Sequence, residues 1–433
     1  MSPLTNHARA AGLILILSST SRVLAAPGEP PPAVPGVALS HHHSSAPPLL
    51  PGLPTSDPNG DPVALPTEGE DRIDATFGRG VRFLSAERDF QLQFRGRLQP
   101  RFLTELAASG DRSVSEFVIR RARLAFLGRF QDSWELYLQL GFSHEDNEPD
   151  YYNPIRDATL TYGVLRDAMI RVGQGKVPFD RQRTNSSSAL QFADRSIVMT
   201  ELTLDRDVGV QVFSENLGGW GGILGYNVGL FSGDGRNRLA TNSGLLVALR
   251  IWTSPFGEFD ANVESDLSRG RTLRLAWGFA AAKNFDTVRP KSTTGETYEA
   301  SSFDYTHLTT DLHLKWRGFS WLSEALYRRA DTDSETHLVD GAPLTEFSRS
   351  AWGFFTQAGY LWTEHFETAA RYGELFPIGQ TDPALLHERE LGSAINYYLS
   401  GHNLKITVDY FFVTRGDDWD GTHQARVQTQ LYF

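Results

Sequence analysis

The sequence predicts an all-β protein: a transmembrane antiparallel β-barrel of about 16 strands. Three observations carry this prediction. Apolar and polar residues alternate in many consecutive segments, short and long polar connectors also alternate, and the last such segment ends the chain on an aromatic residue, Phe433. Of the 433 residues 39 are Gly, 27 are Phe and none is Cys. Glycine and aromatic residues without long apolar runs are typical of β-proteins with many turns.

The N-terminal segment predicts export. The apolar run Ala10–Leu17 follows Arg9 and precedes the small residues of "RVLAA". It is too short to cross a membrane as a helix, but it has the length of the apolar region of a secretory signal. We therefore expect residues 1–26 to be a signal peptide, with a buried terminal helix as the less favoured alternative.

Residues 27–87 are predicted to form a proline-rich, disordered linker. Up to about Asp71 proline is frequent, aromatic residues are absent and no periodicity appears, as is typical of flexible, partly polyproline linkers. The run His41–His43 would bind a metal only adventitiously, because nothing else there could complete a coordination shell. We expect no cofactor and no metal site.

Strand-like alternation begins near residue 88 and continues to the C-terminus, so residues 88–433 are predicted to form the barrel. In "DFQLQFRGRLQPRF" one set of alternate residues, called one parity below, is mostly apolar, and the other set is polar or basic. The same pattern returns in "SWELYLQLGF", "RTLRLAWGF" and "NLKITVDYFF". A period of two residues fits a strand that has one apolar face and one wet face.

The connectors predict how the barrel is oriented. Tight links are expected near residues 130–133, 164–167, 317–320, 362–365 and 400–403, and longer polar links lie between them. Short periplasmic turns and long extracellular loops are typical of outer-membrane barrels. The segment "SPFGEFDANVESDLSRG" is long where a short turn is expected, so the strand count could differ there by one hairpin.

The final segment, "ARVQTQLYF", should close the barrel. An unpaired strand edge in lipid leaves backbone groups without partners, so the last strand must pair with the first. Phe433 shares the lipid-facing parity and is expected in the aromatic girdle at the membrane interface. A soluble β-sandwich or lectin-like barrel is the alternative, but neither needs short and long connectors to alternate.

Two stretches resemble a known family. They are "FVIRRARLAFLGRF", residues 117–130, and "MIRVGQGKVPFDRQRTNSSSALQFADRS", residues 169–196. Together they are similar to the phosphate-selective porin O and P family of Gram-negative outer membranes. The resemblance implies a trimeric sixteen-stranded porin whose lumen arginines and lysines conduct anions. Many members are only presumed to select phosphate, so the resemblance is better evidence for the fold than for the solute.

The parity opposite the apolar face should line a water-filled lumen. On the first two strands it carries the basic residues Arg95, Arg97, Arg121 and Arg123, with fewer acids. Arginine suits an anion path, because its planar fork donates several hydrogen bonds to oxyanions and stays charged. Alternatively, such arginines only brace the wall by pairing with acids. Arg120 falls on the lipid parity and is either at the interface or on a bulge, so it is not assigned to the lumen.

The connection from Lys176 to Arg206 is longer than joining two strands requires. Long structureless connections in compact proteins are usually functional, so we expect it to fold inward and narrow the pore. Ser186–Ser188 would be neutral donors nearby, and Asp180, Asp194 and Asp205 would hold some of the charges in place. The predicted pore-lining residues are Arg95, Arg97, Arg121, Arg123, Arg171, Lys176, Arg181 and Arg183.

The predicted function is an outer-membrane porin for passive diffusion of small anions, with phosphate as the candidate solute. The net charge of −11 argues against a nucleic-acid partner. An enzyme is not expected, because His307 and His313 share a face with Asp311 but no serine is placed for activation. The expected partners are small anions, outer-membrane lipid and two further copies of the chain. The alternatives are a general porin without ion preference and a structural or adhesive barrel with a plugged pore.

Overall fold

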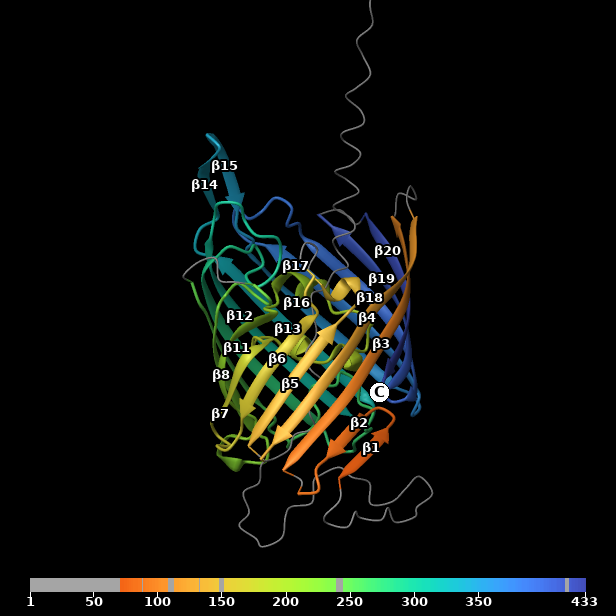
Figure 1. Cartoon of the computed structure of the whole chain (residues 1–433). Helices are drawn as coiled ribbons and strands as arrows, with labels where there is room; N and C mark the ends of the chain where they lie inside the picture. The colour runs from red at the N-terminus through yellow and green to blue at the C-terminus, as the bar shows by residue number, and fades with distance from the viewer. Residues whose placement is uncertain are drawn as a thin grey trace, which may run out of the picture.

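The computed structural model describes residues 71–87, 89–107, 113–131, 133–147, 152–238, 244–416 and 420–433. The predicted signal peptide and most of the predicted linker lie outside these ranges. Among the described residues, sixteen antiparallel strands form a closed barrel (Figure 1). The predicted fold class and strand number are therefore confirmed.

Consecutive barrel strands are hydrogen-bonded neighbours, so the barrel follows the order of the chain. The barrel strands are β3 (Phe90–Ala107), β4 (Ser113–Phe130), β5 (Trp134–Gly141), β6 (Ile155–Tyr162), β7 (Met169–Lys176), β8 (Arg206–Ser214), β9 (Leu224–Phe231), β10 (Leu246–Thr253), β11 (Arg274–Thr287), β12 (Phe303–Trp316), β13 (Phe319–Ala330), β16 (Ala351–Leu361), β17 (Phe366–Pro377), β18 (Glu388–Ser400), β19 (Leu404–Arg415) and β20 (Gly421–Tyr432).

The predicted alternation of faces is clear in β18. Leu391 and Ile395 are 57% and 48% exposed on the outward face, whereas Glu390 and Asn396 are buried inside the barrel. Successive side chains of a strand point to opposite faces, so one parity meets lipid and the other meets the lumen.

The last strand closes the barrel, as predicted. β20 pairs with β3, and Phe433 continues this pairing: its N–H donates to the Gly96 carbonyl at 3.0 Å, and its own carbonyl accepts from Gly96 N at 2.6 Å. The Phe433 ring covers Gly96 so closely that a Cβ atom there would lie 2.3 Å from it. Glycine at this position lets the terminal aromatic ring pack on the outward face.

The five predicted tight turns all join consecutive barrel strands, and they lie at one end of the barrel. Most of the longer links lie at the other end. One of them contains a separate hairpin of β14 (Ser334–Val339) and β15 (Ala342–Phe347), which projects beyond the barrel in Figure 1. The two ends are called the short-turn end and the long-loop end below.

Part of the segment predicted to be a disordered linker, residues 27–87, forms strands beside the barrel. β1 (Arg72–Thr76) and β2 (Gly80–Leu84) form an antiparallel hairpin, and β2 pairs with the first residues of β3. The reason is the stagger of the seam: β20 pairs with β3 only from Arg97 onward, so the start of β3 would otherwise present an open edge. The hairpin covers that edge.

Residues 177–205, the inserted loop, fold into the barrel as predicted, and their narrowing of the pore stays a prediction. The loop contains α2 (Arg181–Thr184), η2 (Ser187–Ala189) and α3 (Ile197–Leu202), and the other short helices are η1 (His144–Asp146) and η3 (Leu217–Gly219). The Asp180 carboxylate caps α2 by accepting from Arg183 N at 2.6 Å. Among the described residues, no helix is long and apolar enough to cross a membrane.

An apolar cluster fixes the inserted loop to one side of the lumen. Phe179, Val198 and Leu202 are fully buried against inward-facing apolar residues of β10, β11, β13, β16 and β17, such as Leu322 and Phe355. Burying these side chains is favourable by about 1.5–3 kcal/mol each. The polar side of the loop is thereby turned toward β3, β4 and β17–β20.

A second segment also enters the barrel, from the short-turn end. Residues 254–273, the turn segment, join β10 to β11 and contain no strand, so the suspected extra hairpin is absent from this described stretch. Glu264, Ser265 and Asp266 of this segment are almost fully buried. The segment is long because it folds back into the lumen.

Candidate functional site

Four guanidinium groups surround one carboxylate of the inserted loop. The Asp194 oxygens lie 2.5 Å from Arg101 Nη1, 3.2 Å from Arg121 Nη2, 3.3 Å from Arg120 Nη2 and 3.5 Å from Arg426 Nη1. Burial alone would raise the pKa of the Asp194 carboxyl, but these positive charges outweigh it and hold that pKa well below its usual range. Asp194 therefore stays ionised and organises the arginines around it.

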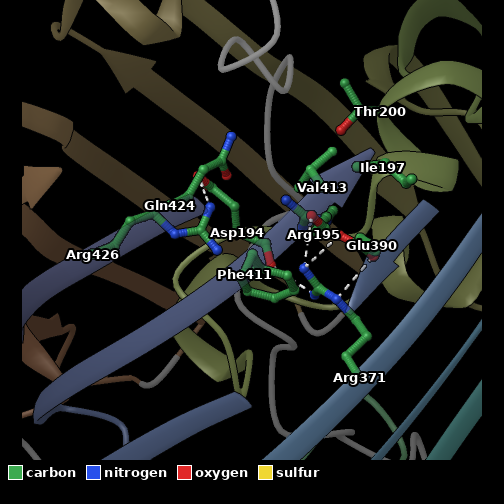
Figure 2. Close-up of a pocket in the computed structure, with 10 residues that line it drawn as sticks. All are labelled: Asp194, Arg195, Ile197, Thr200, Arg371, Glu390, Phe411, Val413, Gln424 and Arg426. Carbon is green, nitrogen blue, oxygen red and sulfur yellow. Dashed lines mark hydrogen bonds and ion pairs between the residues drawn. The ribbon is translucent and has the colours of Figure 1, made fainter. Parts of the chain in front are cut away.

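A small cavity beside Asp194 carries further charged groups (Figure 2). Arg371 donates to the Asp194 carbonyl at 2.9 Å and pairs with Glu390 at 3.0 Å. The Arg371 and Arg426 guanidiniums lie over the Phe411 ring, 4.6 Å and 4.9 Å from its centroid. The polar lining residues are Asp194, Arg195, Thr200, Arg371, Glu390, Gln424 and Arg426. We call these residues together with Arg101, Arg120 and Arg121 the basic cluster.

The assignment of Arg120 away from the lumen is wrong. A β-bulge shifts the register between β3 and β4: Gln99 pairs with Arg121, and Pro100 pairs with Ile119. Arg120 is the extra residue, and both Arg120 and Arg121 are buried inside the barrel. Proline has no N–H for the strand ladder and is tolerated at such bulges, which accounts for the position of this one.

A second bulge adds another arginine that the sequence analysis missed. Gln139 pairs with Asp157 and Leu140 with Ile155, so Arg156 is left over on β6 and points inward. Its Nη1 lies 3.1 Å from the Asp146 carboxylate. Simple alternation cannot place such residues, because each bulge changes the parity of the strand.

Two predicted pore-lining residues belong to a second group of charges, in which arginines have their own acids. Arg123 pairs with Asp146, and Arg183 pairs with Asp205. Burial raises the pKa of Asp205, but the charges of Arg183 and Arg206 outweigh it and keep that pKa well below its usual range. Arg123 thus holds the β5–β6 link to β4, and Arg183 holds two parts of the inserted loop together at Asp205, which also lies 3.2 Å from Arg206 of β8.

The other predicted residues lie at different places in the lumen. Arg121 belongs to the basic cluster, and Arg97 donates to the Ser186 and Ser187 hydroxyls at 3.1 Å each, so the expected serine donors do lie close to the wall. Lys176 Nζ is buried without a hydrogen-bond partner among the described residues. Arg181 pairs with Asp311.

Arg95 and Arg171 are not brought to the basic cluster. Arg95 reaches the Tyr432 hydroxyl at 3.4 Å near the short-turn end. Arg171 donates to Thr161 at 3.1 Å and lies over the Phe213 ring. Both are only partly buried, at the starts of β3 and β7. Their predicted role in contacting solute remains a prediction.

The three loop aspartates were expected to hold basic residues of the loop, and Asp205 does so, whereas Asp194 and Asp180 have other partners. Asp205 holds a loop arginine, but Asp194 holds arginines of the wall. Asp180 caps α2 and accepts from the Thr203 hydroxyl at 2.6 Å. The lumen also holds more acids than the sequence analysis assigned, among them Glu324 of β13, which accepts from Arg181 N and Gln182 N.

Asp311 and His313 hold loops to the wall, and the His307 ring packs edge-on against Phe179 of the inserted loop. Asp311 pairs with both Arg181 and Arg250, and the His313 ring nitrogens lie 3.0 Å and 3.2 Å from the carbonyls of Ala261 and Glu264. These contacts connect the wall to the inserted loop and the turn segment. Asp311 and His313 therefore have a structural role.

A closed barrel of this size with an inserted loop and a charged lumen defines an outer-membrane porin channel. The model of the phosphate-selective porin O and P family matches residues 95–433, and the chain belongs to that family. Family and fold point to a bacterial outer-membrane channel rather than an enzyme. An uncharacterized protein of Aquifex aeolicus (strain VF5) is 24% identical over 399 residues, which cover 80% of this chain and 89% of that protein.

Solved structures with the same fold are distant in sequence. An anion-selective porin from Comamonas acidovorans superposes with a TM-score of 0.52 at 11% identity, over 79% of this chain and 100% of that one. A loop L8 deletion mutant of OmpT from Vibrio cholerae gives 0.51 at 12% identity, over 80% and 100%. The channel DcaP of Acinetobacter baumannii gives 0.50 at 12%, over 79% and 97%. At such identities the likeness shows the fold alone.

Proposed function

We propose that this porin conducts small anions and that phosphate is among its solutes. The observation that carries the proposal is the excess of arginine over acid in the basic cluster. Six arginines, Arg101, Arg120, Arg121, Arg195, Arg371 and Arg426, gather where the acids are Asp194, Asp409, Glu390 and Glu145.

This excess favours anions for a physical reason. A narrow wall of low dielectric constant focuses the field of its charges and raises the local concentration of counter-ions. Guanidinium forks also donate paired hydrogen bonds to the oxygens of phosphate or carboxylate groups. Thr200 and Gln424 offer neutral polar groups in the same cavity. Asp194 moderates the positive potential, so that an anion can enter and leave again.

The sign of the reversal potential tests the proposal. The full chain in a planar bilayer, under a potassium chloride gradient, should give a reversal potential of the anion-selective sign. Added phosphate should reduce the chloride current, because it competes for the same donors. A cation-selective sign would contradict the proposal, and anion selectivity without any phosphate effect would remove phosphate from it.

A general porin without ion preference is the second candidate, and one observation favours it. Many lumen arginines are already neutralised, for example Arg206 by a bidentate contact with Asp157 at 3.0 Å on both oxygens. If pairing cancels the field throughout the lumen, the reversal potential will lie near zero. An adhesive, plugged barrel would instead show almost no conductance.

We also propose that the channel works as a homotrimer in the outer membrane, with residues 1–26 removed on export. The family resemblance supports the trimer, and the sequence pattern of the N-terminus supports the signal. Cross-linking of intact cells, followed by electrophoresis without boiling, should give a band at three times the barrel mass. A monomer band alone would contradict the trimer.

A further inference from the structure

The turn segment, residues 254–273, meets the inserted loop inside the lumen. Glu264 lies at the centre of this contact. Its carboxylate accepts hydrogen bonds from Gln191 N at 2.8 Å, Gln357 Nε2 at 2.8 Å and Gln182 Nε2 at 3.1 Å, and its own N–H donates to the Ala189 carbonyl at 3.0 Å. Segments that enter from opposite ends of the barrel are thus joined directly.

The wall holds the same stretch of the turn segment from the other side. The Ser265 hydroxyl lies 2.7 Å from the Tyr398 hydroxyl and 3.1 Å from the Glu367 carboxylate. Lys315 Nζ donates to the Asp260 carbonyl at 2.8 Å. The turn segment is therefore fixed between the inserted loop and strands β12, β17 and β18.

This contact excludes solvent. Gln182, Gln191 and Glu264 are each at most 1% exposed. All three donors to the Glu264 carboxylate are neutral amide groups. The nearby Lys315 and Lys405 ammonium groups already donate to the carbonyls of Asp260 and Leu190, and the buried Glu264 carboxylate repels anions. This part of the lumen is therefore a barrier to anions and not a step on their path.

We propose that the turn segment is a second constriction, which closes the lumen at its short-turn end by locking onto the inserted loop through Glu264. An ion that has passed the basic cluster leaves the barrel only when this lock opens. The lock goes beyond the proposed anion selectivity, because it would limit the passage of any solute.

Removing the Glu264 carboxylate tests the lock. Glu264→Ala leaves three buried donors without their acceptor, which should shift the closed-to-open ratio by about tenfold or more toward open. The measurement is the open probability of single channels formed by the full chain in a planar bilayer. Glu258→Ala is the matched control: it removes the same group from an exposed position of the same segment and should change nothing.

A reversible cross-link tests the lock in the opposite direction. The chain has no Cys, so a pair introduced as Ala189→Cys and Glu264→Cys has no competing thiol. The backbone hydrogen bond between these residues places them within reach of a disulfide. Oxidation should hold the channel closed, and reduction should give the high open probability of Glu264→Ala.

Three outcomes would separate the possibilities. The lock would be overturned if the open probability were unchanged both in Glu264→Ala and in a variant in which a short turn replaces residues 258–268. This result counts only if both variants migrate as folded, heat-modifiable barrels. Unlocked channels with a cation-selective reversal potential would support the lock and overturn the anion proposal. Anion-selective wild-type channels that the cross-link leaves conducting would overturn the lock alone.

Discussion

Two regions of the lumen bury charge in opposite ways. In the basic cluster, four guanidiniums share the Asp194 carboxylate, whereas at the lock three neutral amides serve the Glu264 carboxylate. The cluster keeps an excess of positive charge, whereas the Glu264 carboxylate is surrounded by neutral donors. If both proposals hold, an ion path is marked by the ratio of cations to acids within reach and not by buried charge alone.

The largest effect is expected from removing the acid of the basic cluster. Asp194→Ala leaves the surrounding arginines buried without their shared partner, which should destabilise the folded barrel by about 3–5 kcal/mol. Loss of the heat-modifiable band on a temperature series measures this. Added phosphate should restore stability in the variant more than in the wild type, because it can replace the missing negative charge.

The control for this prediction is an ion pair on the surface. Lys283 pairs with Asp331 at 2.8 Å, and the Asp331 side chain is 58% exposed. Asp331→Asn should lower the stability of the folded barrel by less than about 1 kcal/mol, because water screens exposed pairs. Equal effects of the two substitutions would show that Asp194 is no more important than a surface acid.

A smaller effect is expected on selectivity when the cluster loses positive charge. Arg120→Gln combined with Arg121→Gln should lower the anion-to-cation permeability ratio severalfold, since charged clefts concentrate counter-ions by about tenfold or more. Reversal potentials in salt gradients measure the ratio. Arg95→Gln removes one positive charge outside the cluster and should have little effect. A shift as large as that of the double variant would show that selectivity depends on charges along the whole lumen.

Alternation predicted the barrel, its closure and the inward face of regular strands, because period two follows directly from strand geometry. It failed for Arg120 and Arg156, since each lies at a bulge whose extra residue reverses the parity. Pro100, the partner of Ile119, was the visible signal for the first bulge. Partner acids were harder to predict, because Asp194 and Glu264 reach the lumen on loops whose path depends on tertiary packing.

The response to pH should be small over the physiological range. The pKa of Asp194 is depressed, so its ion pairs favour the folded state above about pH 4 and lose this effect as pH falls further. Selectivity set by the arginines around Asp194 should therefore stay constant from about pH 8 to about pH 5. Reversal potentials at several pH values measure this, and a loss of selectivity between these values would place a weaker acid or a histidine in the path.

The smallest effect is expected outside the barrel, in the β14–β15 hairpin. Its strands pair only with each other among the described residues, so it contributes no charge to either lumen region. Glu346 must be kept, because its carboxylate accepts from the N–H groups of Glu299, Ala300 and Ser301 at 2.7–3.0 Å and holds the neighbouring loop.

Glu335 and Glu346 face each other across the hairpin, so replacing residues 336–345 with an Asn–Gly turn shortens it without opening the loop. Conductance, open probability and reversal potential should all equal those of the wild type, because the field at the basic cluster and the contacts of Glu264 are unchanged. Altered conductance would place the hairpin at the pore entrance. Unchanged conductance together with loss of cell-surface binding would assign adhesion to the hairpin and leave conduction to the lumen.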